Sequence, residues 1–325
     1  MTLCTAWVRQ ENDKQELIVA TDSCLSGGER WHTGVKLFEL PRKDCLICFA
    51  GDTERTYPLI LNLISSIKFD AHLSSASTDI KEVLEYITNL FTELCNSISN
   101  YGTREFKDVL GSFNFLFGGW SWKDSKFYIW RLDYLHDAKG FVPTQDHDNL
   151  IFSFIGDNLY EAQELLQKEL VDNRKVLAGR LDMEPLNVLI RMIREKEYDS
   201  IDGAIQLAKI YPPGSVEFFG VMWPSISGKK TFLGKDVTFD NNPDVKFIDP
   251  DTGSILGHGL PETLDAIDEN IFGTNAQIVK ELYPDGHLKP NATARQKMVL
   301  KQILAEVAYS NFVNGLVRPD EEEDV

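Results

Sequence analysis

Thr2 is the residue whose type and position could do chemistry most directly, because it follows the starting residue Met1. Methionine aminopeptidases remove a starting methionine when the second residue is small, so we expect the mature chain to begin at Thr2. A terminal threonine offers a hydroxyl nucleophile and, beside it, an α-amino group that can act as the base. The unperturbed pKa of such an amine is about 7.7 to 8.0, so a substantial neutral fraction can accept a proton near neutral pH.

Such a nucleophile needs supporting groups from other parts of the chain. A lysine ammonium near the amine would hold the amine neutral and favour the ionised hydroxyl, and a buried aspartate would fix the lysine. Backbone N–H groups would stabilise the oxyanion that forms on the attacked carbonyl. The pattern of apolar residues indicates which elements could position these groups.

The first hundred residues predict two hairpins followed by two helices. Apolar and β-branched segments on either side of a polar stretch predict an antiparallel hairpin over residues 2–23. The alternation in VKLFEL and the apolar run CLICFAG predict a second hairpin, which ends at Gly51. Apolar residues at helical spacing then predict helices over Thr53–Phe69 and Asp79–Ile98.

Strand and helix signals then follow in runs. The segments FNFLFGGW, KFYIWRLD and LIFSFIGD predict strands, residues 158–170, 183–195 and 200–210 predict helices, and GSVEFFGVMW predicts a last strand. Runs of each type, instead of strict alternation, favour antiparallel sheets covered by helices. We therefore expect an α+β fold, specifically a four-layer α-ββ-α sandwich.

The character of the sequence changes after Pro224. We expect one domain over residues 1–224 and an extension of mixed loop and helical stretches over 225–319. Residues 320–325 are nearly all acidic and lack apolar partners, so we expect a disordered tail.

Composition and charge exclude several classes of function. The 325 residues are 43% hydrophobic, which is enough apolar material for a sizeable core. The formal charge of -17 disfavours nucleic acid and anionic membrane as partners. No apolar run is long enough for a membrane span, and the start lacks the features of a secretion signal. The 5 cysteines are odd in number in a chain that needs no disulfide framework, which favours a reducing cytoplasm.

Four segments together resemble the N-terminal half of proteasome β-type subunits, and in particular the HslV-type peptidase and the Anbu-type homologue of bacteria. They are TLCTAWV at the start, ATDSCLSGG after one hairpin, GVKLFEL after the loop, and CFAGDT at the end of the next strand. The resemblance implies an N-terminal nucleophile hydrolase fold in which Thr2 is the nucleophile. It also implies that Asp22 orients the lysine, that Lys36 is the cation beside the nucleophile, and that Gly51 gives the oxyanion N–H.

The resemblance is weaker further along and ends near residue 224. The family has a G-S-G turn before a long helix, where this chain has Gly156, Asp157 and Asn158. A carboxylate or an amide thus replaces the supporting serine hydroxyl. A second supporting pair, an aspartate and a serine, is expected between Tyr211 and Ser215, where the chain has a glycine and a serine but no aspartate. Candidate supporting residues in addition to the inner set are Ser23, Gly156, Asp157 and Ser215.

Every one of these residues also has a plainer interpretation. Asp22 could be a turn residue, Lys36 an exposed strand lysine, and Gly51 the glycine that ends a strand before a helix. Their joint occurrence in the family's order favours the catalytic interpretation.

Other motifs favour structural roles. Cys45 and Cys48 form a C-x-x-C in an apolar strand, where side chains three apart point to opposite faces, so we expect buried thiols rather than a metal site. Asp249, Asp251 and Gly253 suggest a calcium loop, but its twelfth position is Leu260, so a turn is expected. The histidines and aspartates between residues 136 and 148 predict a solvated acidic loop, with a metal site as the alternative: His136, Asp137, Asp146, His147 and Asp148.

The expected function is that of a threonine-type endopeptidase that hydrolyses peptide bonds through an acyl-enzyme, with no metal and no organic cofactor. The family resemblance implies peptides or unfolded polypeptides as substrates and a homo-oligomeric ring or stack, and the C-terminal extension could bind a partner protein. Two alternatives remain open. One is an amidase of the same fold that acts on a small amide. The other is a catalytically silent binding or assembly module that keeps Met1.

Overall fold

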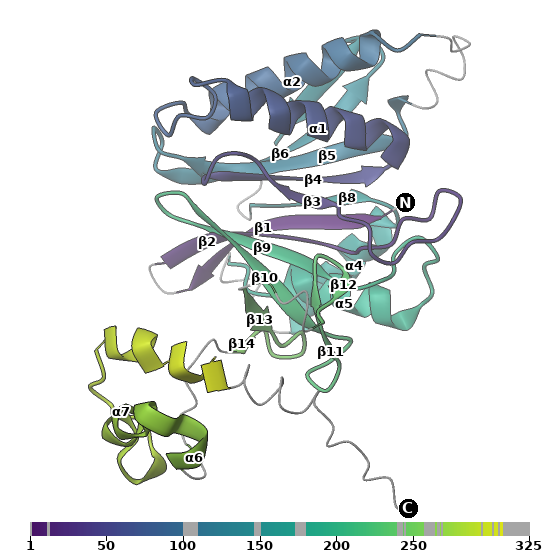
Figure 1. Cartoon of the computed structure of the whole chain (residues 1–325). Coiled ribbons are helices and arrows are strands. Elements are labelled where there is room, and N and C mark those ends of the chain that lie inside the picture. The colour runs from purple at the N-terminus through teal and green to yellow at the C-terminus, as the bar shows by residue number, and fades with distance from the viewer. Residues whose placement is uncertain are drawn as a thin grey trace, which may run out of the picture. The chain divides into compact units, whose positions relative to one another are not determined.

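The structure is a computed structural model of the chain, shown in Figure 1. It describes residues 2–11, 14–99, 110–145, 151–172 and 180–238, and beyond these 243, 245–256, 264, 267, 269–293, 295–300, 302–304 and 306–307. The chain divides into two compact units, Met1–Ile255 and Leu256–Val325. The boundary therefore differs from the one predicted after residue 224, and the predicted acidic tail at 320–325 lies outside the described residues.

The larger sheet contains the start of the chain. It has nine strands, seven of them in the order β12-β11-β10-β9-β2-β1-β8, with β13 paired to β10 and β14 paired to β13. Its strands are β1 (Leu3–Glu11), β2 (Lys14–Thr21), β8 (Phe152–Gly156), β9 (Gln206–Tyr211), β10 (Ser215–Trp223), β11 (Lys229–Phe232), β12 (Lys235–Asp236), β13 (Lys246–Ile248) and β14 (Ile255–Leu256). The pairs along the main path are antiparallel, whereas β10 and β13 are parallel.

The second sheet is antiparallel throughout, in the order β3-β4-β5-β6-β7. Its strands are β3 (Leu37–Glu39), β4 (Cys45–Gly51), β5 (Phe113–Ser121), β6 (Lys126–Leu135) and β7 (Gly140–Thr144). Four longer helices accompany the sheets: α1 (Thr53–Phe69), α2 (Ile80–Asn96), α4 (Leu159–Asp172) and α5 (Glu184–Glu195).

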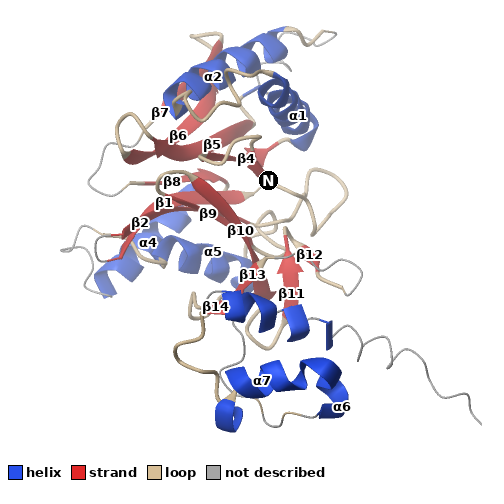
Figure 2. Ribbon diagram, turned by 60° about the vertical axis from the view of Figure 1, so that its left-hand side comes forward, coloured by secondary structure: helices blue, strands red, loops and turns tan. Residues whose placement is uncertain are grey.

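The first unit is layered as helices, sheet, sheet, helices, as Figures 1 and 2 show. One apolar cluster packs α1 and α2 against the β3–β7 sheet, and another packs α4 and α5 against the larger sheet. A third cluster lies between the two sheets and takes side chains from both, including Cys4, Leu37 and Cys48. The expected mixture of helices with antiparallel sheets is confirmed.

Local sequence explains where the first two helices begin. Asp52 caps α1 by accepting a hydrogen bond from the Glu54 N–H. Asp79 and Glu82 form a capping box at the start of α2. The Asp79 side chain accepts a hydrogen bond from the backbone N–H of Glu82, and the Glu82 side chain accepts one from the backbone N–H of Asp79. The buried positions of α2 recur at helical spacing and face the sheet: Ile80, Val83, Leu84, Ile87, Phe91 and Cys95.

One predicted element is wrong: residues 200–210 do not form a helix. They lead into and include most of the strand β9, which lies between β2 and β10. Because the strand is covered on both faces, its apolar residues form a nearly continuous run, which periodicity alone does not distinguish from a buried helix. Leu207 packs into the helix-covered cluster and Ala208 into the cluster between the sheets.

The residues after Pro224 also extend the sheet, which the sequence did not predict. The strands β11 and β13 both pair with β10, so this segment belongs to the first unit. The second unit has short helices, α6 (Glu269–Phe272) and α7 (Ala276–Leu282), around its own apolar cluster. None of the helices in the described parts of the chain is both long and apolar enough to cross a membrane.

Candidate active site

Asp22 directly follows β2 and is completely buried. Its Oδ1 accepts a hydrogen bond from the Leu3 N–H at 3.1 Å, and its Oδ2 accepts from the Cys24 N–H at 2.9 Å and the Asp202 N–H at 3.4 Å. The backbone thus holds the carboxylate in one orientation. Because the Leu3 N–H belongs to the first peptide after Thr2, the same contact fixes the start of β1.

Lys36 precedes β3, and its side chain is also completely buried. Its Nζ lies 3.0 Å from Oδ1 and 2.9 Å from Oδ2 of Asp22, and it also donates to the Thr2 hydroxyl. The Lys36 backbone is held on both sides, because its N–H donates to Gln206 and its carbonyl accepts from the Phe49 N–H. We call Thr2, Lys36 and Asp22 together the Lys36 group.

Thr2 is only 1% exposed, and its backbone lies against the turn that follows β8. Its carbonyl accepts a hydrogen bond from the Asp157 N–H at 2.8 Å. Gly156 makes this approach possible, because a β-carbon added there would lie 1.9 Å from the Thr2 carbonyl oxygen. The same β-carbon would lie 3.2 Å from that of Ala50, so β4 also ends close to Thr2.

Gly51 is the last residue of β4 and follows Ala50. Its φ of 108° is a conformation that side chains disfavour, and an added β-carbon would lie 2.1 Å from the Ser112 carbonyl oxygen. Both the backbone angle and the space therefore require glycine.

Burial and charge have opposing effects on the Asp22 carboxyl. Burial raises the pKa of Asp22 above its ordinary value, while the Lys36 ammonium and the N–H donors of Cys24 and Leu3 oppose the shift. The Lys36 ammonium and the Asp22 carboxylate are close together and shielded from water, so each charge is stabilised only while the other is present. The arrangement places a cation against the Thr2 hydroxyl, where it would favour the ionised oxygen.

Ser23 supports the loop next to Asp22. Its hydroxyl donates to the His32 carbonyl at 2.6 Å and accepts from the Ala204 N–H at 2.9 Å. Its own N–H donates to the carbonyl of Asp202 at 3.3 Å. Ser23 thus connects the backbone after β2 to the segment that enters β9.

Asp202 and Gln206 contact the Lys36 group, and sequence reasoning missed both. The Asp202 backbone touches Asp22 and Ser23, and its carboxylate binds Lys196 at 2.9 Å and Arg30 at 2.8 Å. Burial acts to raise the pKa of Asp202, but hydrogen bonds from Lys196, Gly203 and Arg30 outweigh burial and hold this pKa below its ordinary value. The Asp-Gly pair at 202–203, with φ 89° at Gly203, was a turn signal that could have been noticed.

The structure does not bring Ser215 to this group. Ser215 pairs with Tyr211 at one end of the β9–β10 hairpin, whereas Gln206 lies at the other end of β9. Five residues of strand correspond to about 17 Å. Residues 211–215 contain no aspartate, and the structure instead places the backbone N–H of Asp202 against the Asp22 carboxylate.

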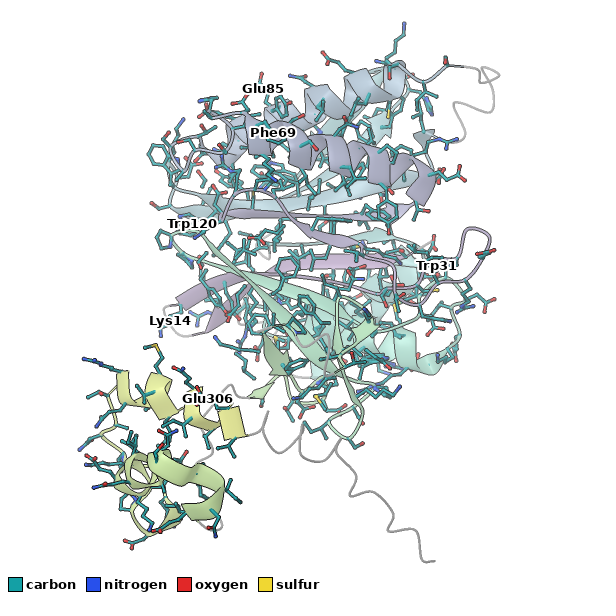
Figure 3. All side chains as sticks on the ribbon, in the orientation of Figure 1. Lys14, Trp31, Phe69, Glu85, Trp120 and Glu306 are labelled. Atoms are coloured by element: carbon teal, nitrogen blue, oxygen red, sulfur yellow. The ribbon has the colours of Figure 1, made fainter. Side chains whose placement is uncertain are left out.

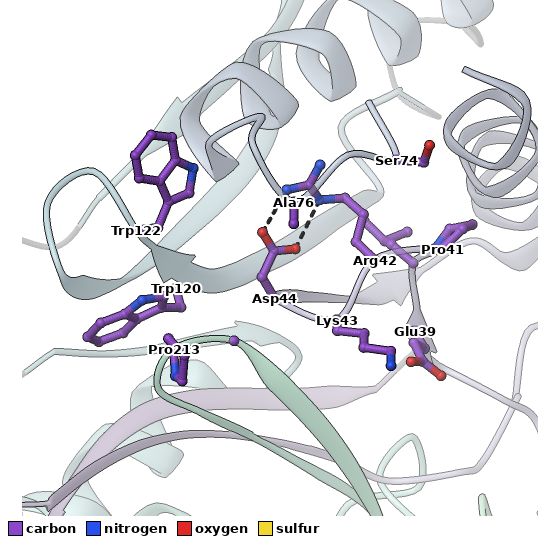
Figure 4. Close-up of a pocket in the computed structure, with 12 residues that line it drawn as sticks. Glu39, Pro41, Arg42, Lys43, Asp44, Ser74, Ala76, Trp120, Trp122 and Pro213 are labelled. Atoms are coloured by element: carbon purple, nitrogen blue, oxygen red, sulfur yellow. Dashed lines mark hydrogen bonds and ion pairs between the residues drawn. The ribbon is translucent and has the colours of Figure 1, made fainter. Parts of the chain in front are cut away.

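A cavity of about 710 Å³ lies at this other end of the sheets (Figure 4). Its walls include Trp120, Trp122 and the β9–β10 turn residue Gly214. The Arg42 guanidinium donates to both carboxylate oxygens of Asp44, at 2.9 and 2.6 Å, and these bonds are drawn as dashed lines. Asp44 precedes β4 and lies about 20 Å along that strand from Gly51, whereas Glu39 and Leu40, which also line the cavity, follow Lys36 by only three and four residues.

The cysteine pair and the 249–253 segment take the plainer forms that were expected, whereas the loop predicted over 136–148 contains the strand β7, which pairs with β6. Cys45 packs in the cluster under α1 and α2, and Cys48 packs between the sheets, so the two thiols point to opposite faces. Asp249 closes a turn by accepting from the N–H groups of Asp251 and Gly253. Residues 146–148 of the acidic loop lie outside the described residues. Within the parts of the chain that are described, no group of three or more histidine, cysteine, aspartate or glutamate side chains could hold a metal ion.

Comparisons with known proteins return structural neighbours only. The chain is similar to the structure of Anbu (ancestral beta-subunit) from Yersinia bercovieri, with a TM-score of 0.46 and 15% identity over 65% of this chain and 82% of that chain. It is also similar to an Anbu (Gly-1) mutant from Hyphomicrobium sp. strain MC1, with a TM-score of 0.45 and 14% identity over the same shares. No family model and no curated protein matches the chain.

Proposed function

We propose that this protein is a threonine-type endopeptidase whose nucleophile is Thr2, exposed by removal of Met1. One observation carries the proposal: the Lys36 ammonium contacts the Thr2 hydroxyl and both carboxylate oxygens of Asp22, with all of these side chains buried. A lysine with no exposed surface that contacts a hydroxyl is an uncommon arrangement for a purely structural role, because desolvating the ion pair is costly. The four motifs described from the sequence support the same assignment.

The reaction would proceed in two steps. The freed α-amino group of Thr2 takes the proton from its own hydroxyl, and the oxygen attacks the scissile carbonyl. The Lys36 ammonium, held by Asp22, stabilises the developing negative charge on the attacking oxygen, and the Gly51 N–H would donate to the oxyanion. The peptide bond breaks as the amine returns the proton to the leaving nitrogen, and water then hydrolyses the ester.

The substrates that we propose are peptides or unfolded polypeptides, and we propose a homo-oligomer as the working form. Both parts rest on the family resemblance of residues 2–224. Native mass spectrometry of the purified chain measures the oligomer directly, and a monomer would contradict that part of the proposal without affecting the chemistry.

Intact-protein mass spectrometry before and after treatment with an epoxyketone probe tests the chemistry. An epoxyketone reacts with both the hydroxyl and the amine of a terminal threonine, so it reports the nucleophile and the free terminus together. We expect loss of the methionine mass and a single adduct that maps to Thr2. A chain that retains Met1 and gains no adduct would overturn the proposal and would favour the binding or assembly module.

Two variants sharpen the experiment. Lys36→Met keeps an unbranched side chain of nearly the same length but removes its charge, so we expect it to abolish the adduct. Thr5→Val is the matched control, because Thr5 is a buried threonine on β1, which begins directly after Thr2, and its hydroxyl has no hydrogen-bond partner among the described residues. It should react like the wild type.

A further inference from the structure

We propose that the hairpin of β11 and β12 is a positioning element of the Lys36 group, with Gly234 as its contact residue. This inference rests on the proposed function, because it concerns the same site. It gives a role in the site to residues that follow position 224, in the part of the chain that the family resemblance does not cover.

The hairpin has a tight turn at its tip. Thr231 pairs with Asp236 and Phe232 pairs with Lys235, which leaves only two residues in the turn. Leu233 and Gly234 have φ angles of 49° and 83°, both positive, as a two-residue type I′ turn requires. Leucine is disfavoured in this left-handed conformation, so contacts elsewhere in the fold must hold Leu233 in it.

Gly234 brings the tip against two residues of the site. An added β-carbon at Gly234 would lie 2.4 Å from the Ser23 β-carbon and 2.6 Å from its hydroxyl oxygen. It would also lie 3.5 Å from the side-chain nitrogen of Gln206. The backbone of the turn therefore packs on Ser23 at a distance that only glycine permits, whereas Gln206 lies close enough for an ordinary van der Waals contact with an added β-carbon.

Ser23 transmits this contact to the acid of the group. It directly follows Asp22, and its hydroxyl is held between the His32 carbonyl and the Ala204 N–H. A displaced Ser23 would therefore move the peptide bond between Asp22 and Ser23. It would also move the Cys24 N–H, which donates a hydrogen bond to the Asp22 carboxylate.

Gln206 transmits the contact to the lysine. Its oxygen accepts from the N–H groups of Lys36 and Leu37, at 3.0 and 3.2 Å, and its nitrogen donates to the Gly34 carbonyl at 2.6 Å. This one amide fixes the backbone on both sides of residue 35. The hairpin tip thus packs on one support of Asp22 and lies next to one support of Lys36.

The hairpin itself is anchored in the larger sheet. The strand β11 pairs with β10 from Val221 to Trp223. The hydroxyl of the buried Thr231 donates to the Val221 carbonyl at 2.9 Å. The tip is therefore held by the sheet and does not depend on Ser23 for its position.

The test is the variant Gly234→Ala, compared with Gly273→Ala. Gly273 also has a positive φ, of 52°, but an added β-carbon there meets nothing within 4 Å, so the control has similar backbone strain without the contact. With a β-lactone probe, we expect Gly234→Ala to lower the maximal rate of Thr2 acylation at least tenfold. The probe concentration that gives half the maximal rate should change less than twofold. The alanine methyl group would displace residues that support Asp22 and Lys36, and it would not contact the bound probe. Gly273→Ala should retain both values.

A second readout does not depend on activity. The buried Lys36 ammonium is expected to give a protected ¹⁵N signal in lysine-labelled protein, assigned by its absence in Lys36→Met. Gly234→Ala should shift or broaden this signal, and Gly273→Ala should leave it unchanged. An unchanged Lys36 signal in Gly234→Ala overturns the inference even if the wild type forms no adduct, whereas a wild type without an adduct overturns only the proposed function.

A double variant covers the case in which Gly234→Ala does not fold. Ser23→Gly removes the β-carbon that the alanine would meet at 2.4 Å. Folded protein from Ser23→Gly with Gly234→Ala would support the contact. If the double variant is as unfolded as Gly234→Ala, while Ser23→Gly alone is folded, the contact is not the cause and the inference is wrong.

Discussion

The side-chain oxygen of Gln206 accepts hydrogen bonds from the backbone N–H groups of Lys36 and Leu37, although 170 positions separate Gln206 from Lys36. The residue is completely buried at the start of β9. It therefore satisfies two donors in the backbone that carries the candidate catalytic lysine.

Gln206→Leu removes this acceptor while nearly keeping the volume. Two buried N–H groups and the Gly34 carbonyl then lose their partner. We expect a loss of about 3 kcal/mol in the free energy of unfolding, measured in urea, together with slower probe acylation of Thr2. Gln167→Leu, on the exposed face of α4, is the control and should change stability by no more than about 0.5 kcal/mol. Equal effects of the two variants would contradict the role of Gln206.

Lys36→Met should destabilise the fold in a pH-dependent way. Burial already raises the pKa of Asp22, and the variant removes the ammonium that opposes this shift. The folded carboxyl then keeps its proton at pH values where the unfolded carboxyl, with a pKa near 3.8, has lost it. Stability relative to wild type should therefore decrease as the pH rises from about 4 towards neutrality, to a deficit of about 3 kcal/mol.

Urea unfolding of Lys36→Met and wild type at pH 4, 5.5 and 7 measures this difference. Adding Asp22→Asn to Lys36→Met removes the titrating group, so the double variant should not show the loss of stability between pH 4 and 7 that Lys36→Met shows. A deficit that is constant over this pH range would show that Lys36 does not compensate the charge of Asp22.

Two buried threonines on neighbouring strands should respond to valine in opposite directions. The hydroxyl of Thr5 is buried and has no hydrogen-bond partner among the described residues, so Thr5→Val should stabilise the protein by about 1 kcal/mol. The Thr21 hydroxyl donates to the Asp22 carbonyl at 3.1 Å and accepts from the Cys4 thiol. Thr21→Val should therefore cost about 1 kcal/mol. Urea unfolding of both variants side by side checks the sign of each change.

The thiol of Cys95 should contribute to instability at alkaline pH. Burial raises the pKa of Cys95 to about 11 from its ordinary value of 9.0. Between these values the unfolded thiol loses its proton while the folded thiol keeps it, so stability falls as the pH rises. Cys95→Ala should show a shallower fall between pH 9 and 11 in urea unfolding. Between pH 6 and 8 the two proteins should have the same slope, and an unchanged slope above pH 9 would contradict the assignment.

The parts of the fold that could be predicted from sequence are those with strong local patterns. The hairpin of β1 and β2 has apolar residues that pair directly, such as Ala6 with Val19, and a polar turn. The helices α1 and α2 have aspartate caps followed by apolar residues at helical spacing. In these segments the local preference and the tertiary packing agree.

The missed elements lack such patterns. The segment before and within β9 is apolar on both faces, so its period is uninformative. The strands β11 and β12 are short and rich in lysine, and they exist because β10 offers them an edge. Asp202 and Gln206 reach the site through contacts across 180 and 170 positions, which no local pattern encodes.

Of the candidate site residues, sequence motifs identified those that depend on short stretches. Lys36 and Asp22 each sit at a strand end within a recognisable segment, and the structure places their side chains together. The family resemblance implied Ser215 as a supporting residue, and the turn at Gly214 carries it to the far end of that hairpin. The position of a residue along a hairpin depends on which residues form the turn. The β9–β10 hairpin was not predicted, because residues 200–210 were expected to form a helix.

The ion pair between Lys36 and Asp22 joins the two sheets, because Lys36 leads into β3 of one sheet and Asp22 leaves β2 of the other. The gap that the pair must span is set by the side chains packed between the sheets, several of them as small as Ala6 and Ala50. A methyl group added to that layer would push the sheets apart and lengthen the contact between ammonium and carboxylate. The reactivity of the buried Thr2 hydroxyl would then depend on the volume of the side chains packed between the sheets.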